Sequence, residues 1–240
     1  MDPTRRTASI FGWLFIATFV LSIPAYFIFY APVMDEPNYI TGAGADESTI
    51  VGLGAVFEVL LIVANVGTAV VLFPIIKRQS ETGAIGYVSA RIVEAIFIAI
   101  GIVSILGILF LREETPSIGD EALGQVLLAI HDRSFLIGPG FFAGLANGVI
   151  LGYLMYRSGL VPRAMTMLGL IGGPLLMLSA IAIMLGLSER GGALQGIATI
   201  PEFFWELSLG IYCVVKGFNP SPILAGYPDT VSVSGNSDRG

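Results

Sequence analysis

The stretch AIGYVSARIVEAIFIAIGIVSILGILFL, residues 84–111, decides the fold class of this chain. Only two of its side chains, Arg91 and Glu94, are charged, and it exceeds the roughly 20 residues that an α-helix needs to cross a ~30 Å hydrocarbon core. Five similar runs flank it, at residues 8–30, 50–76, 134–156, 162–187 and 193–217. The sequence therefore predicts an all-α fold, a polytopic membrane bundle of six transmembrane helices.

The composition is that of a membrane domain. Of 240 residues, 55% are hydrophobic and 12% are charged, and the mean hydropathy is +0.83, whereas soluble domains carry about 25% charged residues. No loop is long enough to fold separately, so we expect one transmembrane domain over residues 1–218. Residues 219–240 are rich in Pro, Gly, Ser and Asp, which predicts a disordered cytoplasmic tail.

Several chemistries are excluded by what the sequence lacks. Cys213 is the only cysteine, so an internal disulfide cannot form and a cysteine-built metal site is not expected. His131 is the only histidine, so a bis-histidine haem cannot be assembled within one chain. No basic face indicates a nucleic-acid partner. We expect no cofactor and no metal. The expected partners are the lipid bilayer and either a second copy of the chain or another membrane protein.

The charges of the loops predict the orientation. Basic residues gather at the N-terminus, in every second loop and after the last helix: Arg5, Arg6, Lys77, Arg78, Arg157, Arg163 and Lys216. The alternate loops are mainly acidic. Because cytoplasmic loops are enriched in Lys and Arg, both ends of the chain are expected in the cytoplasm of a bacterial cell, with the bundle in the inner membrane.

Aromatic residues near the predicted helix ends suggest interfacial belts. These residues are Trp13, Tyr87, Tyr153 and Tyr156 on the cytoplasmic side and Tyr26 and Tyr30 on the outer side.

The fourth run carries a glycine stripe, with Gly140, Gly144, Gly148 and Gly152 at every fourth position. Such a stripe lets a neighbouring backbone approach closely, and we favour packing within the bundle over the alternative of a dimer face. The Gly138–Gly140 segment, Gly-Pro-Gly, is expected to break the helix. Residues 121–133 would then form a surface helix that leads into the fourth span.

Ionisable residues inside the predicted spans are the main functional clue, because each costs at least ~2.5–3.5 kcal/mol at the bilayer centre. Shared helix faces and helix-interior asparagines predict a polar cavity formed by Glu58, Asn65, Arg91, Glu94, His131, Asp132, Asn147, Glu202 and Glu206. Its clustered carboxylates would have to be protonated, face water or hold a cation. No catalytic residue can be assigned.

A structural interpretation competes with the cavity. Glu58, Glu202 and the 131–133 run could lie at headgroup level, and Arg91–Glu94 could be a structural ion pair. The placement of Glu94 and Glu206 distinguishes the two, because one shared cavity favours a functional site and separate ion pairs favour a structural one.

Six motifs together resemble a bacterial membrane family known as domain of unknown function 4386. They are GAGAD (42–46), ANVGTAVVLFPIIKR (64–78), ARIVEAIFIAIG (90–101), HDRSFLIGPGFF (131–142), RSGLVPRAMTMLGLIGGP (157–174) and ATIPEFFWELSLGIYCVVKGF (198–218). The resemblance covers nearly the whole chain apart from the tail and supports six helices, but it implies no activity.

Three functions are compatible with these observations. The first is a transporter for a proton, a cation or a small solute, favoured by the excess of carboxylates. The second is a membrane-embedded enzyme acting on a lipid-type substrate, in which His131 and Asp132 would supply acid–base chemistry. The third is a sensor or assembly partner without chemistry. We expect transport rather than catalysis, because excess buried charge is the feature least expected of a purely structural bundle.

Overall fold

The computed structural model describes residues 2–35, 39, 47–113 and 119–227, and this part of the chain is mostly helical. The elements are α1 (Pro3–Pro24), η1 (Ala25–Phe29), α2 (Ala31–Asp35), α3 (Glu47–Ile76), α4 (Glu81–Glu113), α5 (Asp120–Phe135), η2 (Leu136–Phe142), η3 (Gly144–Leu151), α6 (Gly152–Ser158), α7 (Arg163–Met184), α8 (Ala193–Val215) and η4 (Pro222–Leu224). Of these, η1, η2 and η3 are π-helical and η4 is a 3₁₀ turn. The described residues contain no strand, which confirms the all-α prediction.

Six helical stretches are long and apolar enough to cross a membrane. They are Pro3–Phe29, Ser48–Ile76, Glu81–Arg112, Asp120–Ser158, Arg163–Met184 and Ala193–Val215. The predicted six-helix membrane bundle is therefore confirmed among the described residues. The largest difference from the predicted boundaries lies in the fourth stretch, which begins at Asp120 instead of residue 134.

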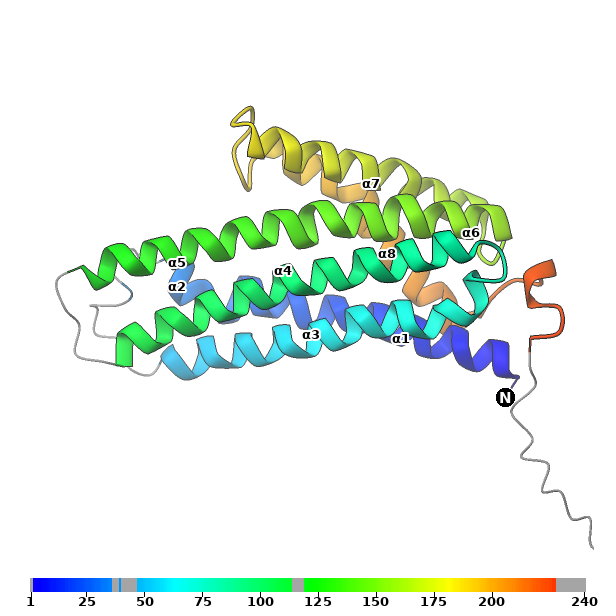
Figure 1. Ribbon diagram of the computed structural model, residues 1–240, viewed down its shortest axis with the longest axis horizontal. Helices are drawn as coiled ribbons and strands as arrows, with labels where there is room; N and C mark the ends of the chain where they lie inside the picture. Colours follow the sequence, from blue (N-terminus) through cyan, green and yellow to red (C-terminus); the bar gives the residue numbers. More distant parts are fainter. Residues whose placement is uncertain (1, 36–38, 40–46, 114–118, 228–240) are drawn as a thin grey trace, which may run out of the picture.

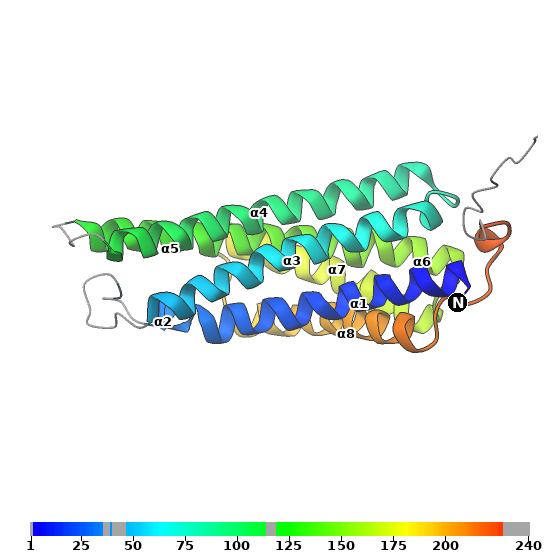
Figure 2. The same ribbon diagram turned by 90° about the horizontal axis from the view of Figure 1, so that it is seen from below.

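The six stretches form a closed ring in sequence order. Along the ring, α1 packs on α3, α3 on α4, α4 on α5, η3 on α7 and α7 on α8, and α8 packs back on α1. The helices lie side by side along the long axis, and α7 and α8 cover only part of the longer helices (Figures 1 and 2). Because the ring is closed, all six stretches contribute to its interior.

One end of the bundle holds both ends of the described chain (Figure 1). There, Arg5 Nη1 donates to the Cys213 carbonyl at 2.9 Å, and Arg78 Nη2 donates to the Ala225 carbonyl at 2.5 Å. We name it the basic end, since it also carries Lys77 and the helix boundary at Arg163. The opposite end is named the distal end. That the basic end faces the cytoplasm stays a prediction.

The Gly138–Gly140 segment does not break the fourth stretch, so the predicted break is wrong. α5, η2, η3 and α6 continue one another from Asp120 to Ser158. The Ala143 N–H donates to the Gly138 carbonyl, five residues earlier. The wide π-helical turn accommodates Pro139, which lacks an N–H for the regular helical bond. Residues 121–133 are accordingly the distal part of this helix and not a separate surface helix.

The glycine stripe of the fourth stretch faces α7. A Cβ added at Gly144 would lie 2.7 Å from the Gly173 carbonyl oxygen, and one added at Gly148 would collide with Gly173 Cα. Gly140 and Gly152 face the same helix at longer distances. The stripe therefore serves packing within the bundle, with the two backbones in contact at Gly144, Gly148 and Gly173.

The outside of the bundle is apolar. Large side chains such as Val103, Leu178 and Ile197 are more than 60% exposed, as expected of a surface that faces lipid. Trp13 and Tyr153 are also exposed. Tyr30 and Tyr87, by contrast, are fully buried, so their interpretation as interfacial belt residues is wrong.

Residues 219–227 belong to the folded part of the chain, which corrects the predicted start of the tail. The Asn219 N–H donates to the Leu160 carbonyl at 2.8 Å, and Tyr212 Oη donates to Asn219 Oδ1 at 2.6 Å. Ile223 and Tyr227 pack against the core of the basic end. The remainder of the predicted tail, 228–240, lies outside the described residues.

Candidate functional site

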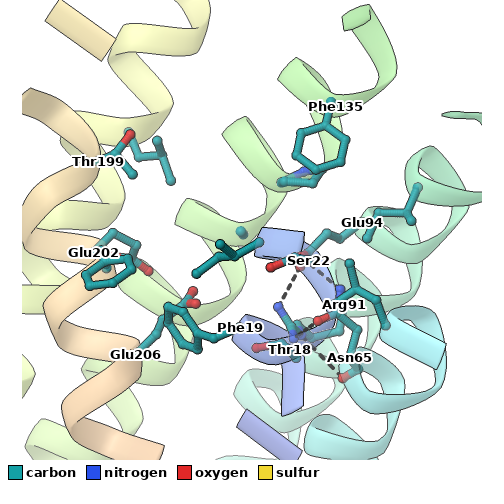
Figure 3. A pocket seen from close by; sticks show the side chains of 17 residues that line it. Thr18, Phe19, Ser22, Asn65, Arg91, Glu94, Phe135, Thr199, Glu202 and Glu206 are labelled. Atoms are coloured by element: carbon teal, nitrogen blue, oxygen red, sulfur yellow. Dashed lines mark hydrogen bonds and ion pairs between the residues drawn. The ribbon is translucent and has the colours of Figure 1, made fainter. Parts of the chain in front are cut away.

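A cavity of about 230 Å³ lies inside the ring. Every one of the six stretches contributes to its wall, through Thr18, Leu61, Arg91, Pro139, Leu176 and Glu202 in chain order. Figure 3 shows Glu202 and Glu206 on one wall and Asn65, Arg91 and Glu94 on the opposite wall. The cavity therefore brings together charged groups that the sequence places more than 100 residues apart.

The first wall is a hydrogen-bonded cluster between α3 and α4. Arg91 Nη1 lies 2.7 Å from Glu94 Oε2, one helical turn along α4. Asn65 Nδ2 donates to Glu94 Oε1 at 3.0 Å, and Arg91 Nη2 donates to Asn65 Oδ1. The Arg91 guanidinium also lies over the Phe15 ring, 5.9 Å from its centroid. Both oxygens of Glu94 are thus satisfied, and the pair is buried with little net charge.

The second wall contains Glu206, which is bound to the fourth stretch. Asn147 Nδ2 donates to Glu206 Oε1 at 2.6 Å. Tyr87 Oη donates to Asn147 Oδ1 at 3.4 Å, and Trp205 Nε1 donates to the Asn147 backbone carbonyl at 2.9 Å. Tyr87 therefore holds the side-chain amide of Asn147 and Trp205 holds its backbone, and together they orient the N–H that Asn147 presents to Glu206.

Glu202 lies one turn from Glu206 and differs from it. Its side chain is 2% exposed, and neither carboxylate oxygen has a hydrogen-bond partner among the described residues. A Cβ added at Gly148 would lie 2.7 Å from Glu202 Oε2, and one at Gly172 would lie 2.9 Å from it. These two glycines therefore leave the space that the carboxyl group occupies at the cavity wall.

Four of the nine predicted cavity residues, Glu58, His131, Asp132 and Asn147, do not line this cavity. Of these, Asn147 is bonded to the lining residue Glu206. Glu58 accepts a hydrogen bond of 2.9 Å from Tyr30 Oη. His131 is fully buried beside the Tyr30 ring at 5.4 Å, and neither of its ring nitrogens has a hydrogen-bond partner in the described part of the chain. The predicted set of nine thus divides into a cavity group and a separate distal group.

Asp132 closes the distal side of the bundle instead. Arg190 Nη1, in the α7–α8 loop, lies 2.7 Å from Asp132 Oδ1, and Arg190 Nη2 donates to Tyr26 Oη at 3.3 Å. The Tyr26 ring packs on Phe135, a cavity-lining residue, at 5.3 Å between centroids. We name Tyr26, Asp132, Phe135 and Arg190 the distal latch. It joins η1, the fourth stretch and the α7–α8 loop.

The basic side of the cavity is filled by large side chains. Phe11, Phe15, Leu72, Leu151 and Leu209 are all fully buried there. The distal side also has a buried apolar cluster, which includes Tyr30, Ile105 and Ile108, and there the polar contacts of the distal latch are added to it.

The family model described as "Domain of unknown function (DUF4386)" matches residues 10–217, which spans all six membrane-crossing stretches. The chain belongs to this family. It is a multi-pass membrane protein. Comparisons with curated proteins and with solved structures gave no match.

In this DUF4386 protein the cavity holds an excess of acid. Its charged lining residues are Arg91, Glu94, Glu202 and Glu206, so three carboxylates face one guanidinium. Within the part of the chain that the structure describes, neither glutamate on α8 forms an ion pair, since the Arg91 guanidinium pairs with Glu94. Among the described residues, no group of three His, Cys, Asp or Glu side chains is arranged to hold a metal ion.

Some cavity residues of the DUF4386 protein were not predicted from its sequence. Thr18, Phe19, Ser22 and Phe203 line the wall beside the charged groups. Small hydroxyl and aromatic residues are ordinary in apolar helices, so nothing in the sequence distinguishes them. Tyr87 does not line the cavity but bonds Asn147, and it could have been found because it lies one turn before Arg91 on the same face of α4.

Proposed function

We propose that this protein is a cell-membrane transporter that exchanges protons for a small organic cation held between Glu202 and Glu206. The observation that carries the proposal is the unpartnered carboxyl group of Glu202, 2% exposed at the wall of a central cavity. A buried carboxylate without a partner is costly, so a proton or a bound cation has to neutralise it. Alternate neutralisation by the two is the chemistry of an exchanger.

Size and lining favour an organic cation over a bare metal ion. The cavity of about 230 Å³ is far larger than the ~10–15 Å³ that holds one water. The Phe19 and Phe203 rings meet edge to face, 5.2 Å between centroids, at the same wall as the glutamates. Ring faces and a carboxylate together are the groups that bind ammonium cations.

The other polar groups fit supporting roles. Because Arg91 neutralises Glu94, this pair contributes to the electrostatic potential in the cavity but does not compete with Glu202 and Glu206 for the cation. Glu206 keeps one oxygen bound to Asn147, so it can share a proton or a cation with Glu202 one turn away. In the bacterial inner membrane, with the basic end in the cytoplasm, the distal latch would face the outside.

Proteoliposomes with an entrapped pH indicator test the proposal. Tetramethylammonium is the probe, because it has no neutral form that crosses lipid unaided. Added outside, it should raise the lumenal pH in vesicles with the wild type. Glu202→Gln should abolish the change, whereas Glu81→Gln, an exposed carboxylate at the start of α4, should not. Equal signals in empty vesicles, or full activity of monodisperse Glu202→Gln, would refute the exchanger.

A further inference from the structure

An apolar groove of about 400 Å³ runs along the outer surface of the bundle between α4 and the fourth stretch. The side chains that line it are Phe97, Ile100, Val126, Ala129, Ile130, Arg133, Ser134 and Ile137. α4 and α5 lie side by side in both views (Figures 1 and 2). The groove is separate from the central cavity, because the two share no lining residue.

Arg133 is the only charged residue of the groove. It is exposed, and within the described residues no hydrogen bond or ion pair joins its guanidinium to another group. The neighbouring carboxylate, Asp132, pairs with Arg190 of the distal latch. The Arg133 guanidinium is therefore free to bind an anionic group from outside the protein.

Its position along the helix brings Arg133 near the lipid headgroups. Arg133 precedes Ser158, the last residue of α6, by 25 positions, which is roughly 37 Å of helix at 1.5 Å per residue. The hydrocarbon core is ~30 Å thick. With Ser158 at the basic edge of the membrane, the Arg133 side chain therefore reaches the phosphates of the distal leaflet.

We infer that this groove holds one acyl chain of an anionic phospholipid whose phosphate pairs with Arg133. The apolar residues provide the surface for the chain, and the guanidinium provides a planar donor pair for phosphate oxygens. Because other lipid tails are as apolar as the groove, shape alone gives no preference for one headgroup. The preference comes from Arg133. An anionic lipid neutralises its guanidinium, whereas the phosphate of a zwitterionic lipid is already paired with that lipid's own ammonium group.

The test measures lipids retained by the full chain after reconstitution in nanodiscs of equal phosphatidylglycerol and phosphatidylethanolamine, followed by native mass spectrometry. We expect the wild type to retain about fivefold more phosphatidylglycerol. Arg133→Gln should bring the ratio close to one. Ala129→Phe, which fills the groove from an exposed position, should reduce retention of both lipids.

Arg6→Gln is the matched control, since Arg6 is exposed at the basic end and its removal changes the net charge equally. Its lipid ratio should equal that of the wild type. An unchanged ratio in Arg133→Gln, or an equal loss in Arg6→Gln, would overturn the site. Thermal unfolding in detergent accompanies each variant, and a ratio lost by Arg133→Gln at unchanged melting temperature supports a binding role over a folding role.

Discussion

Asn147 donates a hydrogen bond of 2.6 Å to Glu206, and this contact joins the π-helical part of the fourth stretch to α8 across the interior of the ring. Tyr87 of α4 and Trp205 of α8 hold Asn147 in turn. Glu202, one turn away, has no such support. The two glutamates of one helix face are thus placed in different surroundings, which is how a pair of like acids acquires different roles.

Removal of the Asn147 amide should weaken the proposed cation site without unfolding the bundle. In Asn147→Ala, Glu206 loses a hydrogen bond to a group that can be charged, worth ~1.5–3 kcal/mol. We expect the KM for tetramethylammonium exchange to rise by tenfold or more. Ser179→Ala is the control, because Ser179 is also buried but bonds only within α7. Equal KM values for Asn147→Ala and the wild type would contradict this role.

A methyl group at Gly148 should destabilise the bundle. The added Cβ meets Gly173 Cα and Glu202 Oε2, so the fourth stretch and α7 must separate. Overpacking of this kind costs ~1–3 kcal/mol. The melting temperature of Gly148→Ala in detergent should fall, whereas Gly196→Ala, with no atom within 4 Å of its added Cβ, should be neutral or stabilising. Stability equal to the wild type would show that the contact is not tight.

Breaking the distal latch should open the cavity from the distal side. Arg190→Ala removes the ion pair to Asp132 and the hydrogen bond to Tyr26. A cysteine introduced at Ser22, which lines the cavity, should then react several-fold faster with a water-soluble maleimide. Arg190→Lys should have a smaller effect, because one ammonium can keep the Asp132 pair. The natural Cys213 is fully buried and contributes little background. Unchanged reactivity would remove the latch from any gating role.

The pair formed by Tyr30 and Glu58 should be structural. Tyr30→Phe leaves the buried Glu58 carboxyl without its hydrogen bond, which costs ~1–3 kcal/mol of stability. The melting temperature should fall, while the KM for exchange should stay that of the wild type, because neither residue lines the cavity. A changed KM at unchanged stability would instead make the distal group part of the transport path.

Truncation should locate the end of the folded domain. A chain ending at residue 227 should melt as the full chain does, since it keeps Asn219, Ile223 and Tyr227 on the core. A chain ending at residue 217 loses these contacts and the Arg78 bond to Ala225, and it should melt lower. Equal melting temperatures for the two truncations would show that the packing of 219–227 contributes little.

The helix count and the fold class were predictable because they depend on apolar length alone, and no tertiary contact is needed to see that residues 84–111 can cross a membrane. The fourth stretch shows the limit. Gly-Pro-Gly usually ends a helix, yet this one continues through a π-helical turn and packs closely on α4, where a Cβ added at Gly138 would lie 3.1 Å from the Glu94 carbonyl oxygen. The contacts around this turn come from a neighbouring helix, so the sequence of the segment itself does not reveal them.

The residues of the site were predictable from their type, but the side chains that they contact were not. Placing Glu94 and Glu206 in one cavity needs the order of helices around the ring, which the sequence does not contain. Adjacency in the sequence is also a poor guide to contact partners. Asp132 follows His131 directly, yet Asp132 pairs with Arg190 whereas His131 lies beside Tyr30. The two side chains stay 3.9 Å apart, from His131 Nδ1 to Asp132 Oδ1, yet their main partners come from different parts of the bundle.

The closure of α1 on α8 has a consequence for biogenesis. A Cβ at Gly12 would lie 2.6 Å from the Gly210 carbonyl oxygen, so α1 packs tightly on α8, which is synthesised about 200 residues later. At a synthesis rate of ~5–20 residues per second, roughly 10–40 s separate the two. During that interval the face of α1 that packs on α8 has no partner. Glu202 and Glu206 of α8 are synthesised only after the other five stretches that line the cavity. The cavity is therefore completed in a single late step, and a ribosome that stalls before residue 193 leaves a membrane protein without Glu202 and Glu206.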